Sequence, residues 1–363
     1  MRGKLGDFRE IDNRLISGAS LSVFANNLTT RLLYLIALRN LGPEVAGKLQ
    51  NPYSGRTLES RKQQMSKTQA GKQSGNETKD AHEIRPGQSI ELLKELHILT
   101  RDGKLNQDSR RKLKQVYHLY QFIEPLLQEI KNDHPDITLA DHGAGKSYLG
   151  FILYDLFFKE RKDQSRIYGI ETRDELVQKS EALAKKLDFP GMSFLNLSVA
   201  DSITSDLLPK KIDVVTALHA CNTATDDAIH FALEKQAKFI VLVPCCQAEV
   251  ASVLKKNKGK TLAKNALTEI WRHPLHTREF GSQVTNVLRC LQLEAHGYQV
   301  NVTELVGWEH SMKNELIIAT YKDLPRKRPT ERLQEVLQTL GLEEMESRFF
   351  TGTTSATTSA DAI

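Results

Sequence analysis

The sequence predicts an α/β protein with a doubly wound, mostly parallel sheet and helices on both faces. Three observations carry this prediction: β-rich apolar runs alternate with helical patterns from Ile137 onward, a glycine-rich turn follows the first run, and an acidic residue ends the second. Right-handed crossovers turn such an alternation into a parallel sheet. We expect strands at 137–141, 166–171, 193–197, 212–218 and 238–243, and helices at 148–160, 173–187, 224–235 and 247–256.

The first turn lies in the segment ITLADHGAGKSYLG, residues 137–150. Gly143 and Gly145 remove side chains where a ligand must approach the backbone, and the following helix start offers free N–H groups. A nucleotide-like cofactor fits this turn. A phosphate-binding P-loop needs glycine where Ala140 stands, and a dinucleotide fingerprint needs glycine where Tyr148 stands. A plain strand-to-helix turn that uses glycine for packing remains an alternative.

Glu171 ends the second predicted strand, about thirty residues after the glycine turn, in the segment RIYGIE. A carboxylate at that strand end can accept hydrogen bonds from both hydroxyls of a ribose, as in dinucleotide sites. The alternative is that Glu171 only begins the next helix. In open α/β sheets ligands bind beyond the carboxyl ends of the strands, so both features are expected on one edge.

Together these residues resemble motifs I and II of class I S-adenosylmethionine (SAM) methyltransferases. The segments 141–146, 217–221 and 243–247 are similar to one subgroup, which holds the methyltransferase domain of the glutathione S-transferase C-terminal-domain-containing protein and, distantly, tRNA acceptor-stem 2′-O-methyltransferases. The resemblance covers roughly residues 108 to 322. It implies a Rossmann-like, mostly parallel seven-stranded sheet, closed by an antiparallel pair formed by the late apolar runs 299–306 and 316–321.

The resemblance also implies roles for the residues at the strand ends. The glycine turn would face the methionine part of SAM, with Asp141 holding its ammonium group. Glu171 would hold the ribose, and Asp201 or a backbone amide beside it would meet the adenine amine. The full set of cofactor-binding residues implied is Asp141, His142, Gly143, Ala144, Gly145, Glu171, Asp201, Leu218 and His219.

Catalytic candidates follow the fourth and fifth predicted strands: His219, Cys221, Cys245 and Cys246. A zinc site is one alternative, but the H-x-C and C-C spacings suit tetrahedral ligation poorly, and we expect no metal. A cysteine nucleophile for cytosine-5 methylation is another, but its Pro-Cys would follow a different strand. The preferred interpretation has small thiols shaping the methyl-transfer channel while His219 orients the acceptor or takes its proton. The amino-methylating signature (N/D/S)-P-P-(Y/F) is absent, so the methylated atom stays open.

Composition bounds the remaining possibilities. No apolar run approaches the ~20 residues of a membrane span, the start lacks the apolar core of a signal peptide, and four cysteines form no disulfide framework. We therefore expect a cytoplasmic protein without membrane association.

Residues 1–136 hold 22 Lys and Arg against 16 Asp and Glu, while the numbers of basic and acidic residues in the rest of the chain are nearly equal. That excess suits a polyanion such as RNA, although a solvated basic surface, with a protein or small-molecule acceptor, remains an alternative.

The predicted domain organisation places the SAM-binding methyltransferase domain at 137–322, with a cap insertion at about 255–297. A helical, basic extension at 86–136 precedes it, and its helix from Gln107 interleaves basic residues with Tyr117 and Tyr120, a combination that can grip nucleic acid. Pro125 is expected to kink or split that helix. The outer parts are a helical segment 1–51, a flexible linker 52–85, a C-terminal helix 323–350 and a disordered tail 351–363.

Overall fold

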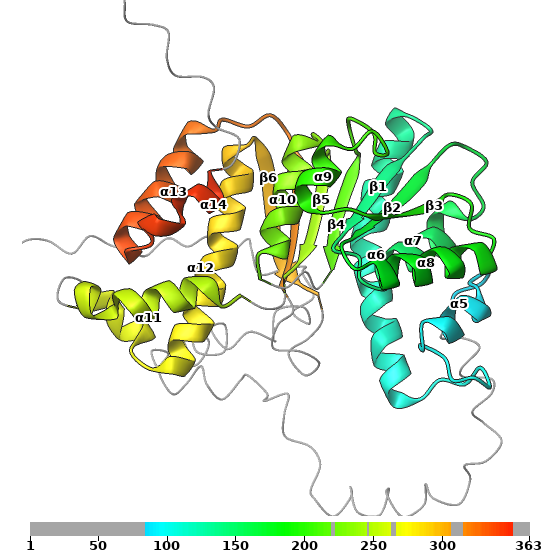
Figure 1. Ribbon diagram of the computed structural model, residues 1–363, viewed down its shortest axis with the longest axis horizontal. Coiled ribbons are helices and arrows are strands. Elements are labelled where there is room, and N and C mark those ends of the chain that lie inside the picture. The colour runs from blue at the N-terminus through cyan, green and yellow to red at the C-terminus, as the bar shows by residue number, and fades with distance from the viewer. Residues whose placement is uncertain (1–83, 219–221, 245–246, 263–265, 306–314, 351–363) are drawn as a thin grey trace, which may run out of the picture. The chain divides into compact units, whose positions relative to one another are not determined.

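A computed structural model describes residues 84–218, 222–244, 247–262, 266–305 and 315–350. The predicted N-terminal segment 1–51, the linker up to residue 83 and the tail 351–363 lie outside the described residues. Seven strands form one sheet in the order β3-β2-β1-β4-β5-β7-β6 (Figure 1). Their bounds are β1 Thr138–His142, β2 Arg166–Glu171, β3 Met192–Asn196, β4 Val214–Leu218, β5 Phe239–Val243, β6 Tyr298–Glu304 and β7 Glu315–Tyr321.

The helices occupy the connections between these strands. They are α5 Ile90–Glu95, α6 Gln107–Asp133, α7 Tyr148–Leu153, α8 Asp174–Lys186, α9 Val199–Thr204, α10 Ala224–Glu234, α11 Glu249–Leu262, α12 Pro274–Ala295, α13 Lys327–Leu340 and α14 Glu346–Phe349. Short 3-10 turns lie at Ala266–Trp271 and Glu343–Met345, and α7 continues into a π-helical turn, Tyr154–Phe158. The predicted helix at 148–160 therefore exists, with a widened second half.

Strands β1 to β5 are parallel, and β7 runs antiparallel to both β5 and β6. This confirms the predicted seven-stranded, mostly parallel sheet. The strand order reverses between β1 and β4, which pair directly. Such a switch point is where open α/β sheets bind ligands, at the carboxyl edge of the strands.

Strand β5, with the sequence FIVLV, shows why the sheet is buried between two helical layers. Phe239, Val241 and Val243 join the hydrophobic cluster formed with α6, α7 and α8, and Ile240 and Leu242 join the one formed with α10. All five residues are at most 2% exposed. A continuous apolar run of this kind is typical of a parallel strand covered on both faces.

Helix α6 is longer than the strands of the sheet on which it packs. Its last turn lies at the amino edge, because Lys238, just before β5, pairs with Asp133 at 2.5 Å and Glu129 at 3.0 Å. Its 27 residues span about 40 Å, whereas a five-residue strand spans about 17 Å. The N-terminal half of α6 therefore extends beyond the carboxyl edge (Figure 1). Pro125 lies within a single continuous helix, so the predicted split does not occur.

The stretch 255–297, expected as a cap insertion, is largely the helix α12. This helix packs on β6, and it contributes Leu293 to the cluster on the α10 side of the sheet. Its 22 residues span about 33 Å and end near the start of β6 at the amino edge. Its first turns, with α11, therefore extend beyond the carboxyl edge (Figure 1). A third cluster joins α11 and α12 to α13 and α14 through Leu333, Leu337 and Phe349.

Within the part of the chain that the structure describes, no helix combines the length and apolar character that a membrane crossing requires.

Candidate functional site

The glycine turn after β1 forms with the backbone conformations that its sequence allows. Gly143 and Gly145 have φ angles of 67° and 58°, a region that glycine enters without steric cost. The Ala144 N–H donates to the Ile170 carbonyl at 3.0 Å, and the Ser147 N–H donates to the Ala144 carbonyl at 2.7 Å. The turn is therefore fastened to β2 and leads directly into α7.

Asp141 lies at the switch point, where β1, β4 and the glycine turn meet. Its carboxylate accepts hydrogen bonds from Thr216 Oγ1 at 2.9 Å and from Ser147 Oγ at 3.1 Å, and the residue is 2% exposed. Burial raises the pKa of Asp141 to about 6, against the opposing effect of these hydrogen bonds. A cation placed beside this carboxyl group would favour its ionised form.

His142 is the next residue of β1 and packs on the opposite side, where its ring centre lies 5.2 Å from that of Phe231 in α10. Burial lowers its pKa to about 4, so the imidazole is neutral at physiological pH, although Glu171 acts in the other direction. Among the described residues, neither ring nitrogen has a hydrogen-bond partner. His142 thus brings a neutral, buried imidazole to the same strand end as Asp141.

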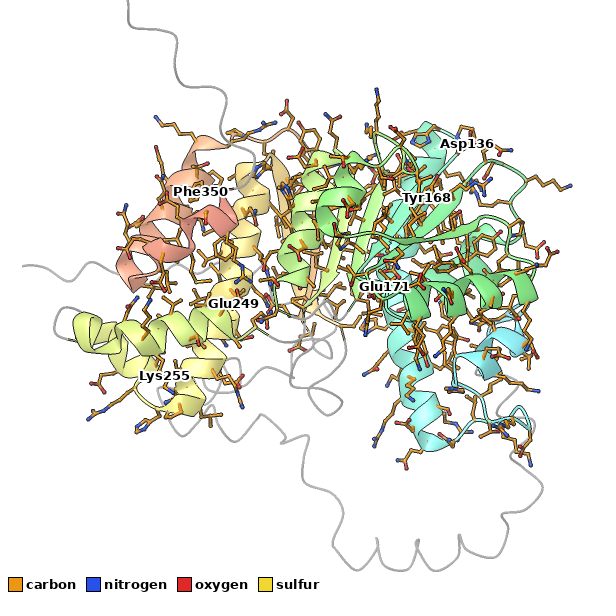
Figure 2. The ribbon with its side chains drawn as sticks, viewed as in Figure 1. Asp136, Tyr168, Glu171, Glu249, Lys255 and Phe350 are labelled. Carbon is orange, nitrogen blue, oxygen red and sulfur yellow. The ribbon has the colours of Figure 1, made fainter. Side chains whose placement is uncertain are left out.

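Glu171 lies at the carboxyl end of β2, as the sequence predicts, and it contacts the glycine turn directly (Figure 2). The Gly145 N–H donates to Glu171 Oε2 at 2.8 Å. Desolvation raises the pKa of this carboxyl group, but the hydrogen bonds and charge of Arg173, with the Gly145 N–H, outweigh it and lower the pKa to about 2. Figure 2 shows Glu171 and Asp136, which precedes β1, at opposite edges of the sheet.

Arg173 is a residue of this site that sequence reasoning missed. Its Nε and Nη2 atoms donate to the two Glu171 oxygens at 2.9 and 3.1 Å. It follows β2 by two positions and precedes α8, so it resembles an ordinary charged helix-start residue in the sequence. Its proximity to a strand-end carboxylate is the signal that was available.

Asp201 lies in the first turn of α9, the helix that follows β3. Strand β3 is the neighbour of β2 in the sheet. The backbone N–H of Asp201 donates to Ser198 Oγ at 3.2 Å, and the Asp201 carboxylate accepts from the same hydroxyl at 2.5 Å. These are the contacts of a helix N-terminal cap. The side chain is otherwise exposed, and its predicted role toward an adenine amine stays a prediction.

The four catalytic candidates His219, Cys221, Cys245 and Cys246 lie outside the described residues, so their roles and the zinc alternative stay predictions. The residues that flank them are described. Leu218 and Val243 pair directly at the ends of the neighbouring strands β4 and β5, so both segments leave the sheet side by side. Among the described residues, no group of three or more His, Cys, Asp or Glu side chains is arranged to hold a metal ion.

A buried polar network contacts the residues that directly follow these two segments. Arg289 of α12 is fully buried and pairs with Asp226 of α10 at 2.7 Å. Its guanidinium also donates to the Asn222 carbonyl at 2.8 Å and to Asn286 Oδ1 at 3.1 Å, and the latter oxygen accepts from Gln247 Nε2 at 2.7 Å. The network therefore fixes Asn222 and Gln247, one residue after each segment.

Sequence reasoning missed Arg289 and Asp226. The available signal was a single arginine inside the apolar run VLRCLQL, which requires a buried partner.

Comparisons with known proteins show which proteins this chain resembles. Residues 111–253 match a family of methyltransferase domains. The glutathione S-transferase C-terminal domain-containing proteins of Mus musculus and Bos taurus are 22% and 21% identical over 238 residues, which cover 61% of this chain and 35% of each relative. The chain thus spans about a third of the length of these curated relatives.

A solved structure of magnesium protoporphyrin IX methyltransferase from Synechocystis PCC 6803, with bound SAH, is 14% identical and has a TM-score of 0.36; the match covers 64% of this chain and 94% of that one. The family match of residues 111–253 spans β1 to β5, with the glycine turn and the end of β2. Residues 111–253 are therefore similar to a methyltransferase domain.

Proposed function

We propose that this chain transfers the methyl group of SAM to RNA. The observation that carries the cofactor assignment is the cluster of Asp141, the glycine turn and Glu171 at the switch point of the sheet. A cofactor with an ammonium group and a ribose requires an acceptor for each, and two buried carboxylates flank a turn that lacks Cβ atoms at Gly143 and Gly145. The residues present therefore fit SAM.

Bound SAM supplies an electrophilic methyl group on its sulfonium. The protein's task is then to align an acceptor atom with that methyl carbon and to accept a proton where the acceptor is a hydroxyl or an amine. We assign the alignment to the segments after β4 and β5, and the proton to His219. The network around Arg289 supports this assignment, because it fixes the described residues on which both segments end.

RNA is supported by helix α6, which extends beyond the carboxyl edge. Residues 101–114, at and before the start of α6, hold six basic and two acidic residues. Arg111, Lys112 and Lys114 are exposed. Burial raises the pKa of Tyr148, which begins the helix after the glycine turn, and the charge of Lys112 opposes this rise. The basic start of α6 extends beyond the same edge of the sheet as the proposed methyl-transfer site, where a polyanionic acceptor would pass.

Tyr117 and Tyr120 have a different role from the base stacking considered in the sequence. The Arg85 guanidinium lies over both rings, 5.0 and 4.6 Å from their centres, and the Tyr117 hydroxyl bonds to Gln88. The two tyrosines thus fasten the chain before α5 onto α6. The basic side chains of α6 are consequently the groups that would contact RNA, through its phosphates.

The experiment that tests this proposal measures binding first and turnover second. Isothermal titration calorimetry with SAM and with S-adenosylhomocysteine (SAH) should show binding, and ATP should not compete. The protein is then incubated with methyl-labelled SAM and total RNA, total protein or a small-molecule extract. We expect label in RNA. Label only in protein or in small molecules would overturn the RNA assignment, and SAM binding without any transfer would identify a scaffold.

A further inference from the structure

The carboxylate that should receive the ribose is already fully engaged in this structure. Glu171 Oε1 accepts from the Arg173 backbone N–H at 3.1 Å, from Arg173 Nε at 2.9 Å and from Thr172 Oγ1 at 3.4 Å. Oε2 accepts from the Gly145 N–H at 2.8 Å and from Arg173 Nη2 at 3.1 Å. Because a carboxylate has about four lone-pair sites, five donors leave no position for two ribose hydroxyls.

The guanidinium of Arg173 and the Thr172 hydroxyl, which lies 3.4 Å from Oε1, are the donors that can leave. The backbone N–H groups are fixed by the turn and by the start of α8, whereas the Arg173 side chain is 66% exposed and ends a flexible stem. Because the guanidinium end is exposed, water screens the pair, and the contact can exchange with water or with a ligand. The carboxylate itself is 8% exposed and cannot move away as easily.

Arg173 presents its donors much as a ribose would. Two parallel N–H groups on one rigid fork approach the two carboxylate oxygens, and two neighbouring hydroxyls of a ribose can make the same pair of hydrogen bonds. The Nη2 atom also lies 3.8 Å from where a Cβ on Gly145 would stand. The guanidinium therefore borders the glycine turn where a cofactor must approach.

We propose that Arg173 occupies the ribose site of the free protein and competes with the cofactor for Glu171, so that it lowers the affinity of the protein for the cofactor. This inference rests on the proposed cofactor.

The test compares SAH binding to the wild-type chain and to Arg173→Gln by isothermal titration calorimetry. Arg173→Gln should bind SAH about three- to tenfold more tightly, because the competing ion pair is gone. Arg173→Lys, which keeps the charge but not the fork, should lie between the two. Lys179→Gln removes an exposed positive charge from the same helix, where Lys179 pairs with Glu175, and should leave the affinity unchanged.

Two further titrations separate competition from other roles. The affinity ratio between variant and wild type should shrink between about 0.05 and 0.5 M NaCl, because salt screens the competing pair. The 2′-deoxyribose analogue of SAH should lose affinity by a similar factor toward the wild type and toward Arg173→Gln, because both ligands displace the same ion pair. Equal or weaker SAH binding by Arg173→Gln would overturn this inference alone. Absence of SAH binding by the wild type would overturn the proposed function and this inference together.

Discussion

At the scale of single residues, the buried carboxyl group of Asp141 affects both cofactor binding and the stability of the folded protein. The carboxyl group is buried with a pKa of about 6, above the 3.8 of an exposed aspartate. The folded state therefore binds a proton more readily than the unfolded state. The contribution of Asp141 to stability is complete below pH ~4 and is lost as the pH rises through about 6. At neutral pH the ionised group destabilises the folded protein unless a cation joins it.

We predict that Asp141→Asn stabilises the free protein at pH 7.5 by ~2–3 kcal/mol, since a shift of about two pKa units corresponds to that free energy. The gain should shrink toward pH 4, where the wild-type carboxyl group is protonated. Urea unfolding at the two pH values measures both quantities. The same variant should lose affinity for SAH through loss of the ammonium partner. A variant that is less stable than wild type at pH 7.5 would contradict the prediction.

Glu171 is predicted to contribute directly to cofactor affinity. Glu171→Ala removes the acceptor for a diol, and hydrogen bonds to charged groups are worth ~1.5–3 kcal/mol, so SAH binding should weaken about ten- to hundredfold. Glu175→Ala, on the exposed face of α8, is the matched control and should bind normally. Calorimetry gives both affinities. Unchanged binding by Glu171→Ala would show that this carboxylate serves only to hold the Gly145 turn and Arg173.

At the scale of elements, one carboxylate connects three helices. Asp226 of α10 pairs with Arg289 of α12 and with Arg348 of α14, and Arg348 also pairs with Glu249 of α11. Because Arg289 has no exposure to water, its charge depends on Asp226 for compensation. Helices α10, α11, α12 and α14 are thus connected to each other through charged groups, and α11, α12 and α14 also through apolar packing.

Asp226→Ala should destabilise the protein by ~3–5 kcal/mol, because it leaves a buried guanidinium without its counter-charge. Thermal or urea unfolding of the full chain measures the loss. Glu331→Ala, which removes an exposed partner of Lys327 on α13, should change the free energy of unfolding by less than ~0.5 kcal/mol. Comparable stability of the two variants would show that water reaches Arg289 in solution.

The regular elements around the cofactor turn were predictable, and α12 was not. Strand β5 is apolar without interruption, and the predicted ranges of all seven strands lie within two residues of the observed ones. Helix α12 buries Thr285, Asn286, Arg289 and Gln292 beside its apolar residues, so polar residues interrupt its buried face and hide its amphipathic pattern. The interior of α6 tolerates Pro125 because the surrounding packing holds the helix, which local propensity does not report.

At the scale of the whole molecule, the positions of the basic residues matter more than the net charge of +5. Arg111, Lys112 and Lys114 lie on the part of α6 that extends beyond the carboxyl edge. A second exposed basic set follows β7 at the amino edge: Lys322, Arg326, Lys327 and Arg328. The two sets carry equal charge once Arg110 is counted with the first, but only the first lies at the same edge of the sheet as the proposed methyl-transfer site.

We predict that changing Arg110, Arg111, Lys112 and Lys114 to Gln weakens RNA binding and flattens its salt dependence by up to ~3 in the log–log slope. The same change at Lys322, Arg326, Lys327 and Arg328 is the matched control and should have little effect on either. Fluorescence anisotropy with labelled RNA over a salt series measures both slopes, and SAH affinity should be unchanged in both variants. Equal effects of the two sets would indicate non-specific attraction and favour a protein or small-molecule acceptor.

The candidate site was predictable where local sequence determines it. Asp141, the glycine turn and Glu171 come from two neighbouring strand ends, so spacing along the chain was sufficient. The role of Arg173 depends on side-chain geometry beside Glu171, and the network around Arg289 includes contacts between residues more than sixty positions apart, such as Asp226 and Arg289. A single sequence holds no record of such contacts, so charged partners within the fold were the least predictable part.

The pairing of β5 with β7 determines which parts of this chain can be separated from each other. The match to the methyltransferase family ends at residue 253, inside α11 and before β7 begins. A fragment cut there would leave the FIVLV strand as an open sheet edge, with its hydrogen-bonding groups unpaired along that side. Long, flat apolar edges of this kind recruit other strands and aggregate. The smallest soluble unit of this protein therefore extends at least to Tyr321, well past the boundary that family resemblance marks.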